Sequence, residues 1–300
     1  MKHILSAAQF DRAELEKILA LAARMAENLK SDGTRLADGK ILATLFYEPS
    51  TRTRLSFETA MLRIGGHVIS TPDTKFSSVQ KGETVEDTIR ILSGFADVIA
   101  MRSSEIGFAE RAAKVSAVPI LNAGDGAGEH PTQSLLDLFT ISKYFSLDKK
   151  ICVTFVGDLK FGRTVHSLTT VLRNFPNVQL RFVAPDELKI PEKYRQPADE
   201  IFTEISPEIL KTTDVLYVTR VQEERFADRA QYERLRDTFI FDAEKISQLP
   251  KKSIVLHPLP RINEISPEVD ALPQAKYFEQ ARNGVPVRMA LISYVLNLIG

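Results

Sequence analysis

Short apolar runs alternate with amphipathic stretches along the chain. The runs lie at residues 41–47, 67–69, 97–101, 118–122, 151–157, 178–183, 215–218 and 254–256. Runs of this length predict buried strands, and helical spacing of apolar residues follows several of them. Strands that alternate with helices indicate a parallel sheet. We therefore predict an α/β fold.

A charged, turn-prone segment at residues 146–150 interrupts this alternation near the middle of the chain. Because 300 residues suffice for two domains of ordinary size, we place a boundary there. The prediction is two domains, residues 1–146 and 147 onward, each a parallel sheet flanked by helices. A last helix is expected over residues 277–299, with a break near Gly284 and Pro286.

The chain has no net charge, since Lys and Arg number 39 and Asp and Glu also number 39. This balance gives no overall attraction to nucleic acid or to an anionic membrane, so we expect neither as a partner. No apolar run is long enough for a bilayer, and the first residues lack a signal-peptide pattern. The single cysteine, Cys152, is typical of a reducing compartment, which favours a cytoplasmic protein.

The segment Ser50-Thr51-Arg52-Thr53-Arg54 stands where the first predicted strand turns into a helix. A helix N-terminus presents N–H groups and a partial positive charge, which suit a phosphate. Hydroxyl groups add donors, and arginine adds a planar fork that matches phosphate oxygens. The alternative is a capped helix start with solvated arginines, but two arginines in one segment favour an anion site.

Further polar residues follow the ends of other predicted strands, namely Arg102, His130, Arg163 and Arg220. Parallel sheets bind ligands beyond the carboxyl ends of their strands. Arg52, Arg102 and His130 should therefore share the edge of one sheet. Arg163 and Arg220 should share the edge of the other, so two anionic substrates are expected.

Motifs for cofactor chemistry are missing from the sequence. Residues 157–162 follow a strand but fit neither G-x-G-x-x-G nor a P-loop, and there is no G-x-S-x-G turn. None of the five histidines has metal-ligand spacing with a second histidine or with the cysteine. We expect no metal and no cofactor, and catalysis by positioning and electrostatic stabilisation.

Three motifs resemble signatures of the aspartate/ornithine carbamoyltransferase family, and they lie at residues 50–54, 130–133 and 257–261. Segments 46–49, 157–167, 219–222 and 283–288 resemble its aspartate-specific branch, so the likeness covers essentially the whole chain. It implies transfer of the carbamoyl group of carbamoyl phosphate to the amine of L-aspartate. The products would be N-carbamoyl-L-aspartate and phosphate, in de novo pyrimidine biosynthesis.

The resemblance also implies what each domain binds. Residues 1–146, joined by a C-terminal helix that returns over about residues 285–300, would bind carbamoyl phosphate. Residues 147–284 would bind L-aspartate.

Roles for single residues follow from the same resemblance. The catalytic set would be Arg52, Thr53, Lys81, Arg102 and His130. Carbamoyl phosphate would be bound by Ser50, Thr51, Arg52, Thr53, Ser77, Arg102, His130, Gln133, Leu259 and Pro260, the last two through backbone carbonyls. L-aspartate would be bound by Lys81, Arg163, Arg220 and Gln222, because a dianion suits two rigid guanidinium forks.

The family also predicts the assembly and its motion. The loop that carries Ser77 and Lys81 would reach a neighbouring subunit, so a homotrimer with shared active sites would be the smallest working unit. Glu48 would bridge to Arg163 and Arg225 as the domains close and expel water. Regulatory chains or other enzymes of the pathway are further candidate partners.

Two alternatives stay open. One is a carbamoyltransferase for another amino acid, although Arg220 argues against the cationic side chain of ornithine. The other is a catalytically silent relative that binds ligands. The chain departs from the family pattern at Ser103-Ser104 and at Asn263, where loop geometry rather than chemistry is in question.

Overall fold

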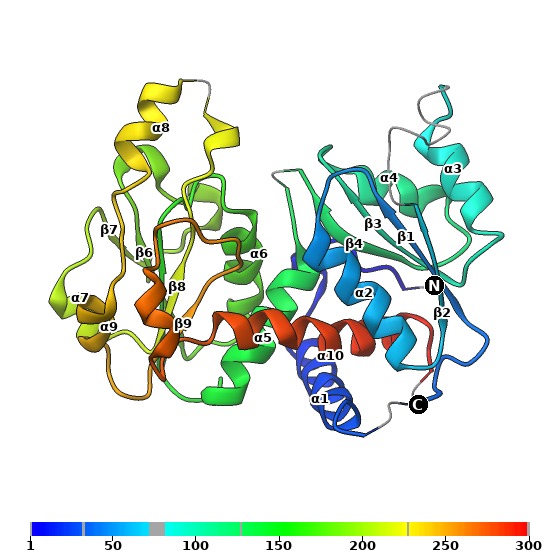
Figure 1. The fold of residues 1–300 in the computed structure, drawn as a ribbon, viewed down its shortest axis with the longest axis horizontal. Helices are drawn as coiled ribbons and strands as arrows, with labels where there is room; N and C mark the ends of the chain where they lie inside the picture. Colours follow the sequence, from blue (N-terminus) through cyan, green and yellow to red (C-terminus); the bar gives the residue numbers. More distant parts are fainter. Residues whose placement is uncertain (1, 32–33, 72–81, 127, 227, 299–300) are drawn as a thin grey trace. The chain divides into compact units, whose positions relative to one another are not determined.

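The computed structural model describes residues 2–31, 34–71, 82–126, 128–226 and 228–298. Within the chain there are two compact units, Met1–Phe139 with Asn283–Gly300 and Thr140–Arg282. Each unit contains one parallel sheet flanked by helices (Figure 1), which confirms the predicted fold class. No helix in the described ranges is long and apolar enough to cross a membrane.

The first unit is built on a sheet with the strand order β2-β1-β3-β4. Its strands are β1 (Ile41–Phe46), β2 (His67–Thr71), β3 (Val98–Ser103) and β4 (Ile120–Asp125). Helices α2 (Thr51–Arg63), α3 (Val85–Leu92) and α4 (Phe108–Val115) connect these strands. Buried residues of β1, β3, α3 and α4 form one hydrophobic core. The N-terminal segment extends the β4 edge through a parallel bridge between Ile4 and Leu121.

The second unit is built on a sheet with the strand order β7-β6-β5-β8-β9. Its strands are β5 (Ile151–Val156), β6 (Val178–Val183), β7 (Glu200–Phe202), β8 (Val215–Val218) and β9 (Ile254–Leu256). Its helices include α6 (Arg163–Leu172), α7 (Pro207–Lys211), α8 (Arg229–Leu235) and α9 (Ala243–Ser247). Every residue of the central strand β5 is buried, as expected for a parallel sheet covered on both faces.

The C-terminal helix α10 (Tyr277–Val295) packs against the N-terminal helix α1 (Arg12–Asn28) of the first unit, in agreement with the predicted return to the first domain. The Tyr294 hydroxyl donates a 2.8 Å hydrogen bond to Glu14 Oε1. The predicted break near Gly284 and Pro286 is wrong, because α10 continues through both residues. Proline removes one backbone hydrogen bond, whereas the fully buried residues that follow it hold the helix in place.

Two other helix starts differ from the sequence patterns. Helix α2 begins at Thr51, earlier than the apolar pattern from residue 55 indicates. Helix α4 begins at Phe108 rather than near residue 105, because Gly107 precedes it in a left-handed conformation with φ 79°. Helix α5 (Pro131–Tyr144) opens on its proline, as expected.

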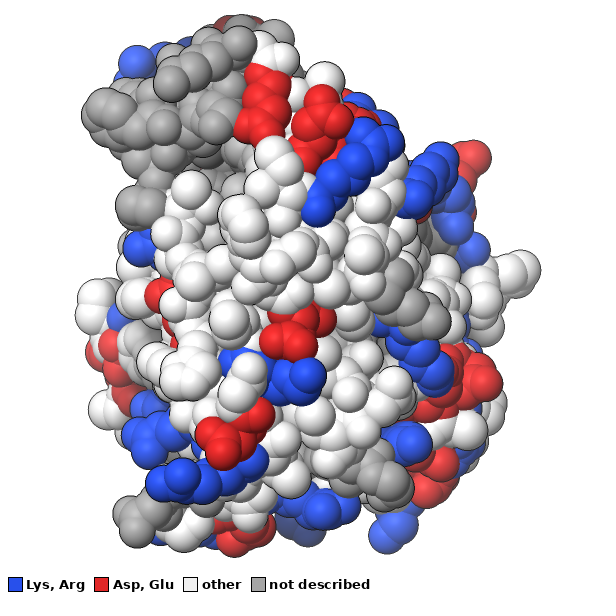
Figure 2. All heavy atoms as spheres, turned by 90° about the vertical axis from the view of Figure 1, so that its right-hand side faces the viewer, with Lys and Arg blue, Asp and Glu red and all other residues white. Residues whose placement is uncertain are grey.

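Charged side chains of both signs are interspersed on the face of the molecule seen in Figure 2, with uncharged residues between them. This pattern agrees with the zero net charge of the chain.

Candidate active site

The N-terminus of α2 stands directly beyond the carboxyl end of β1. Ser50 is the N-cap residue, and within the described structure its hydroxyl makes no capping hydrogen bond. Thr51 and Arg52 are exposed in the first turn, while Thr53 is buried. The first turn therefore presents hydroxyl groups and a guanidinium next to the N–H groups of a helix start.

Arg102 lies at the carboxyl end of β3, where it pairs in register with Phe46 of β1. Although Arg52 as a whole residue is exposed, partial burial of its guanidinium, and after it the positive charge of Arg102, lowers the pKa of Arg52. Burial also lowers the pKa of Arg102, and the charge of Glu48 opposes this shift. Glu48 Oε2 is 3.2 Å from Arg102 Nε. Two neighbouring guanidiniums repel each other, and an anionic ligand that contacts both relieves this repulsion.

His130 is buried, only 4% exposed, directly before the start of α5. The loop before it is fixed by hydrogen bonds on both sides. The Glu129 N–H donates to Asp125 Oδ1 over 2.7 Å. The Glu129 carboxylate accepts from the Ser6 hydroxyl over 2.8 Å and from the Ala7 N–H over 2.6 Å. His130 is thus held in place by the N-terminal segment and by the end of β4.

In the second unit, Asp158 joins the loop after β5 to the loop after β8. Its side chain is fully buried and accepts from the Phe161 N–H over 3.0 Å and from the Gln222 N–H over 3.4 Å. Burial raises the pKa of Asp158 to about 6, although these N–H groups and the charge of Arg220 act in the opposite direction. One carboxylate therefore positions both loops.

The predicted aspartate-binding residues lie on these loops. Arg163 is the first residue of α6, and Arg220 and Gln222 follow β8; all three side chains are half-buried. Arg225 belongs to the short 3-10 helix that follows Gln222.

The turn at Leu259 and Pro260 is organised by His257, which is 1% exposed. His257 Nδ1 accepts from the Leu259 N–H over 2.8 Å, so Nε2 carries the proton and donates to Glu264 Oε1 over 2.7 Å. Glu264 also accepts from the Ile262 and Asn263 N–H groups. The backbone of Leu259, with φ 53°, is held at the carboxyl end of β9.

The structure thus brings Arg52 close to Arg102 in the first unit and Arg220 close to Asp158 in the second. Ser77 and Lys81 lie outside the described residues. The contacts of Glu48 with Arg163 and Arg225 stay predictions. At the two departures from the family pattern, Ser103 Oγ accepts from the Glu105 N–H over 3.1 Å, and the Asn263 amide donates to Asp237.

Several positioning residues were not predicted from the sequence. They are Glu129, Asp137, Asp158 and Glu264, whose carboxylates accept hydrogen bonds from backbone N–H groups or from side chains. Asp158 directly follows the glycine that ends a strand, and Asp137 lies four residues after Gln133, so spacing alone gave a weak signal for both.

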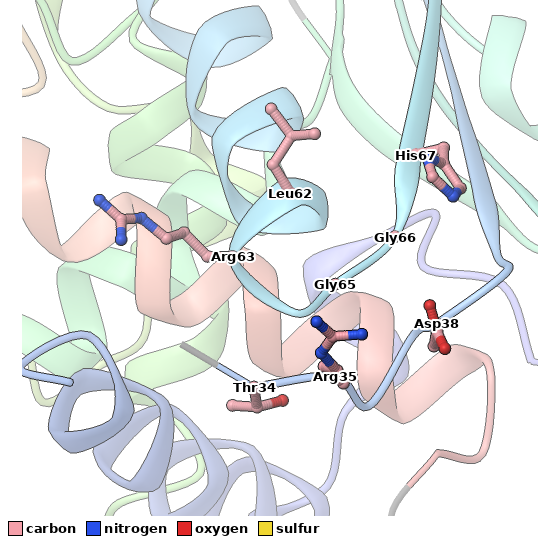
Figure 3. A pocket seen from close by; sticks show the side chains of 8 residues that line it. All are labelled: Thr34, Arg35, Asp38, Leu62, Arg63, Gly65, Gly66 and His67. Carbon is pink, nitrogen blue, oxygen red and sulfur yellow. The ribbon is translucent and has the colours of Figure 1, made fainter. Parts of the chain in front are cut away.

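A separate pocket lies in the first unit at the turn from α2 to β2 (Figure 3). It is lined by Thr34, Arg35, Asp38, Leu62, Arg63, Gly65, Gly66 and His67. None of these is a predicted site residue, and the charged residues among them are exposed. The pocket is therefore not part of the candidate active site.

Comparison with known proteins gives the same picture over the whole chain. Residues 2–143 match the carbamoyl-P binding domain of aspartate/ornithine carbamoyltransferases, and residues 149–295 match their Asp/Orn binding domain. The aspartate carbamoyltransferase catalytic subunit of Clostridium novyi is 49% identical over 302 residues, which cover 99% of this chain and 98% of that protein.

Solved structures agree with these matches. The catalytic subunit of Methanocaldococcus jannaschii aspartate transcarbamoylase is 47% identical, with a TM-score of 0.91 over 99% of this chain and 98% of that one. Trypanosoma cruzi aspartate transcarbamoylase in complex with N-(phosphonacetyl)-L-aspartic acid is 41% identical. Its TM-score is 0.92 over 98% of this chain and 95% of that one.

Proposed function

Because this chain belongs to the aspartate/ornithine carbamoyltransferase family, we propose that it transfers the carbamoyl group of carbamoyl phosphate to L-aspartate. The aspartate amine attacks the carbonyl carbon, and the bond from that carbon to the bridging phosphate oxygen breaks. The amine loses a proton, which leaves with the phosphate. The products are N-carbamoyl-L-aspartate, an intermediate for pyrimidine biosynthesis, and inorganic phosphate.

The observation that carries this proposal is the guanidinium of Arg52 at the start of α2 together with that of Arg102 at the carboxyl end of β3. The positive charge of Arg102 lowers the pKa of Arg52, which places the two guanidiniums near each other, and Glu48 lies beside Arg102. A dianionic phosphate relieves this repulsion and also accepts from helix N–H groups. We assign the phosphate to Ser50, Thr51, Arg52 and Thr53, with Ser77 from the loop.

The carbonyl oxygen of carbamoyl phosphate becomes more negative as the amine attacks. Thr53, Arg102 and His130 are the groups proposed to stabilise it, since preorganised donors are worth most where charge develops. Gln133 and the backbone carbonyls of Leu259 and Pro260 are proposed to hold the carbamoyl amide.

Most of the groups proposed for L-aspartate belong to the second unit, and Lys81 belongs to the first. Arg163 and Arg220 are proposed to bind its two carboxylates, with help from Gln222 and Lys81. This choice disfavours ornithine, whose side chain carries a positive charge. Glu48 is proposed to bridge to Arg163 and Arg225 when both substrates are bound.

For the assembly, we propose a cytoplasmic homotrimer in which Ser77 and Lys81 of one subunit serve the site of its neighbour. The family resemblance supports the trimer, and the single buried cysteine is compatible with a reducing cytoplasm. Regulatory chains or other pathway enzymes would act on this trimer.

The test is a product assay on purified protein with carbamoyl phosphate and either L-aspartate or L-ornithine. Carbamoyl-aspartate as the only product is expected, because two arginines bind a diacid and repel a cation. Carbamoyl-ornithine would overturn the assignment of Arg163 and Arg220. Binding of carbamoyl phosphate without any product would favour the silent-relative alternative.

A further inference from the structure

Gln133 and Asp137 lie one helical turn apart on the same face of α5. Gln133 Nε2 donates a 2.8 Å hydrogen bond to Asp137 Oδ1. Asp137 is fully buried, with an exposed fraction of 0%. A carboxylate removed from water in this way requires nearby positive charge or hydrogen-bond donors.

Arg288 on α10 supplies positive charge near Asp137. It is 3% exposed, and its guanidinium lies 4.9 Å from the centroid of the Phe57 ring of α2. Burial lowers the pKa of Arg288 to about 10, and the negative charge of Asp137 opposes this shift. A Cβ atom added at Gly284 would lie 2.3 Å from Arg288 Nη1, so the guanidinium rests against the backbone of its own helix.

The chemistry of these groups decides which way the Gln133 amide faces. An ionised carboxylate only accepts hydrogen bonds, so Gln133 must turn its NH₂ group toward Asp137. Its Oε1 atom then faces away from Asp137 and can accept a hydrogen bond. A ligand group that binds Oε1 must donate a hydrogen bond from an N–H. The amino group of a carbamoyl group can do so, and a methyl group cannot.

We propose that Asp137, beside the positive charge of Arg288, is a positioning residue that fixes the Gln133 amide. In this orientation Gln133 selects an acyl phosphate with an amino group over one with a methyl group. This inference rests on the proposed function, because it deepens the role given there to Gln133. Arg288 acts on Gln133 only through Asp137.

The test compares the wild-type protein with Asp137→Asn, Gln133→Ala and the double variant. For each protein, dissociation constants are measured for carbamoyl phosphate, for acetyl phosphate and for inorganic phosphate. Asparagine offers both a donor and an acceptor, so it lets the Gln133 amide turn over. Asp137→Asn is expected to reduce the preference for carbamoyl over acetyl phosphate on the order of tenfold, with unchanged affinity for inorganic phosphate.

The double variant is expected to behave like Gln133→Ala, because Asp137 has no effect once the glutamine amide is gone. Asp199→Asn is the matched control. Asp199 is a buried carboxylate paired with Arg173 in the second unit, and its loss should leave the preference intact. An undiminished preference in Asp137→Asn, or an equal loss for inorganic phosphate, would overturn the proposal.

A measurement on the wild-type protein covers the case in which Asp137→Asn does not fold. In protein labelled with ¹⁵N at glutamine, the Gln133 side-chain NH₂ signal is identified by its absence in Gln133→Ala. It is expected to exchange slowly with water before and after carbamoyl phosphate is added. Fast exchange in the free protein would contradict the fixed orientation, and a wild-type protein that does not bind carbamoyl phosphate would overturn the proposed function as well.

Discussion

At the scale of single residues, His166 shows how a buried side chain links stability to pH. It is 5% exposed and stacks on Tyr194 with ring centroids 4.3 Å apart. Its Nε2 lies 2.8 Å from the Leu159 carbonyl oxygen. Burial lowers the pKa of His166 from 6.5 to about 4, and the Leu159 carbonyl opposes the shift only in part. The folded protein therefore keeps His166 neutral where the unfolded chain is protonated.

The sign of the pH dependence follows from proton uptake on unfolding. Between pH 6.5 and about 4 the unfolded state binds one more proton at His166, so stability falls as the pH is lowered through this window. We expect a loss of roughly 1–3 kcal/mol from this group across the window. His166→Gln should flatten the slope in chemical unfolding followed from pH 7 to 4.5. The exposed His67→Gln is the control, and an unchanged slope in His166→Gln would contradict the assignment.

At the scale of elements, the sequence predicts the strands better than the helix boundaries. Strand β5 is a nearly continuous apolar run, because a sheet covered on both faces needs one, whereas β6 also contains Gln179 and Arg181. Strand β7 was not predicted, since it has three residues and is partly exposed. The start of α4 depends on the backbone conformation of Gly107, which the apolar pattern does not report.

In the candidate site too, some residues could be predicted from the sequence and others could not. Its arginines could be predicted because they follow strand ends, and parallel strands bring such positions to one edge. The buried carboxylates beside them could not, since Asp158 acts on the backbone of the distant loop after β8 and Glu264 acts through the side chain of His257. Which loops meet is decided by the packing of the whole sheet and not by local sequence.

Gly157 affects both stability and the candidate site, because it lies where β5 ends beside the end of β8. Its φ is 117°, and an added Cβ would lie 2.2 Å from the Thr219 carbonyl oxygen. Gly157→Ala should lower the free energy of unfolding by about 2–4 kcal/mol through backbone strain and displacement of residues 219–222. It should also raise the KM for aspartate while leaving carbamoyl phosphate affinity nearly unchanged.

The matched control is Gly39→Ala. Gly39 also has a positive φ, 73°, but an added Cβ there meets no atom within 4 Å. It should cost about 1–2 kcal/mol from backbone strain alone. An equal effect of the two substitutions on stability and on the KM for aspartate would show that the close approach to Thr219 is unimportant.

At the scale of the whole molecule, the central question is whether one chain can complete a site. The predicted catalytic set includes Arg52 and Lys81, and the family resemblance assigns Lys81 to the site of a neighbouring subunit. In the proposed trimer, Arg52→Ala and Lys81→Ala chains should each be inactive on their own. A mixture of the two, dissociated and reassembled, then contains some sites with both wild-type groups.

The expected recovery follows from counting. In equal mixtures, a site has an intact Arg52 in half of the cases and an intact neighbouring Lys81 in half, so about a quarter of wild-type activity should return in closed trimers. A mixture of Arg52→Ala with Arg102→Ala is the control, because both residues belong to the same unit of one chain, and it should recover nothing. Activity is measured as carbamoyl-aspartate formed per subunit. No recovery in the first mixture would mean that each chain builds its own site, since only a lysine supplied by a neighbour can rescue a chain that lacks its own.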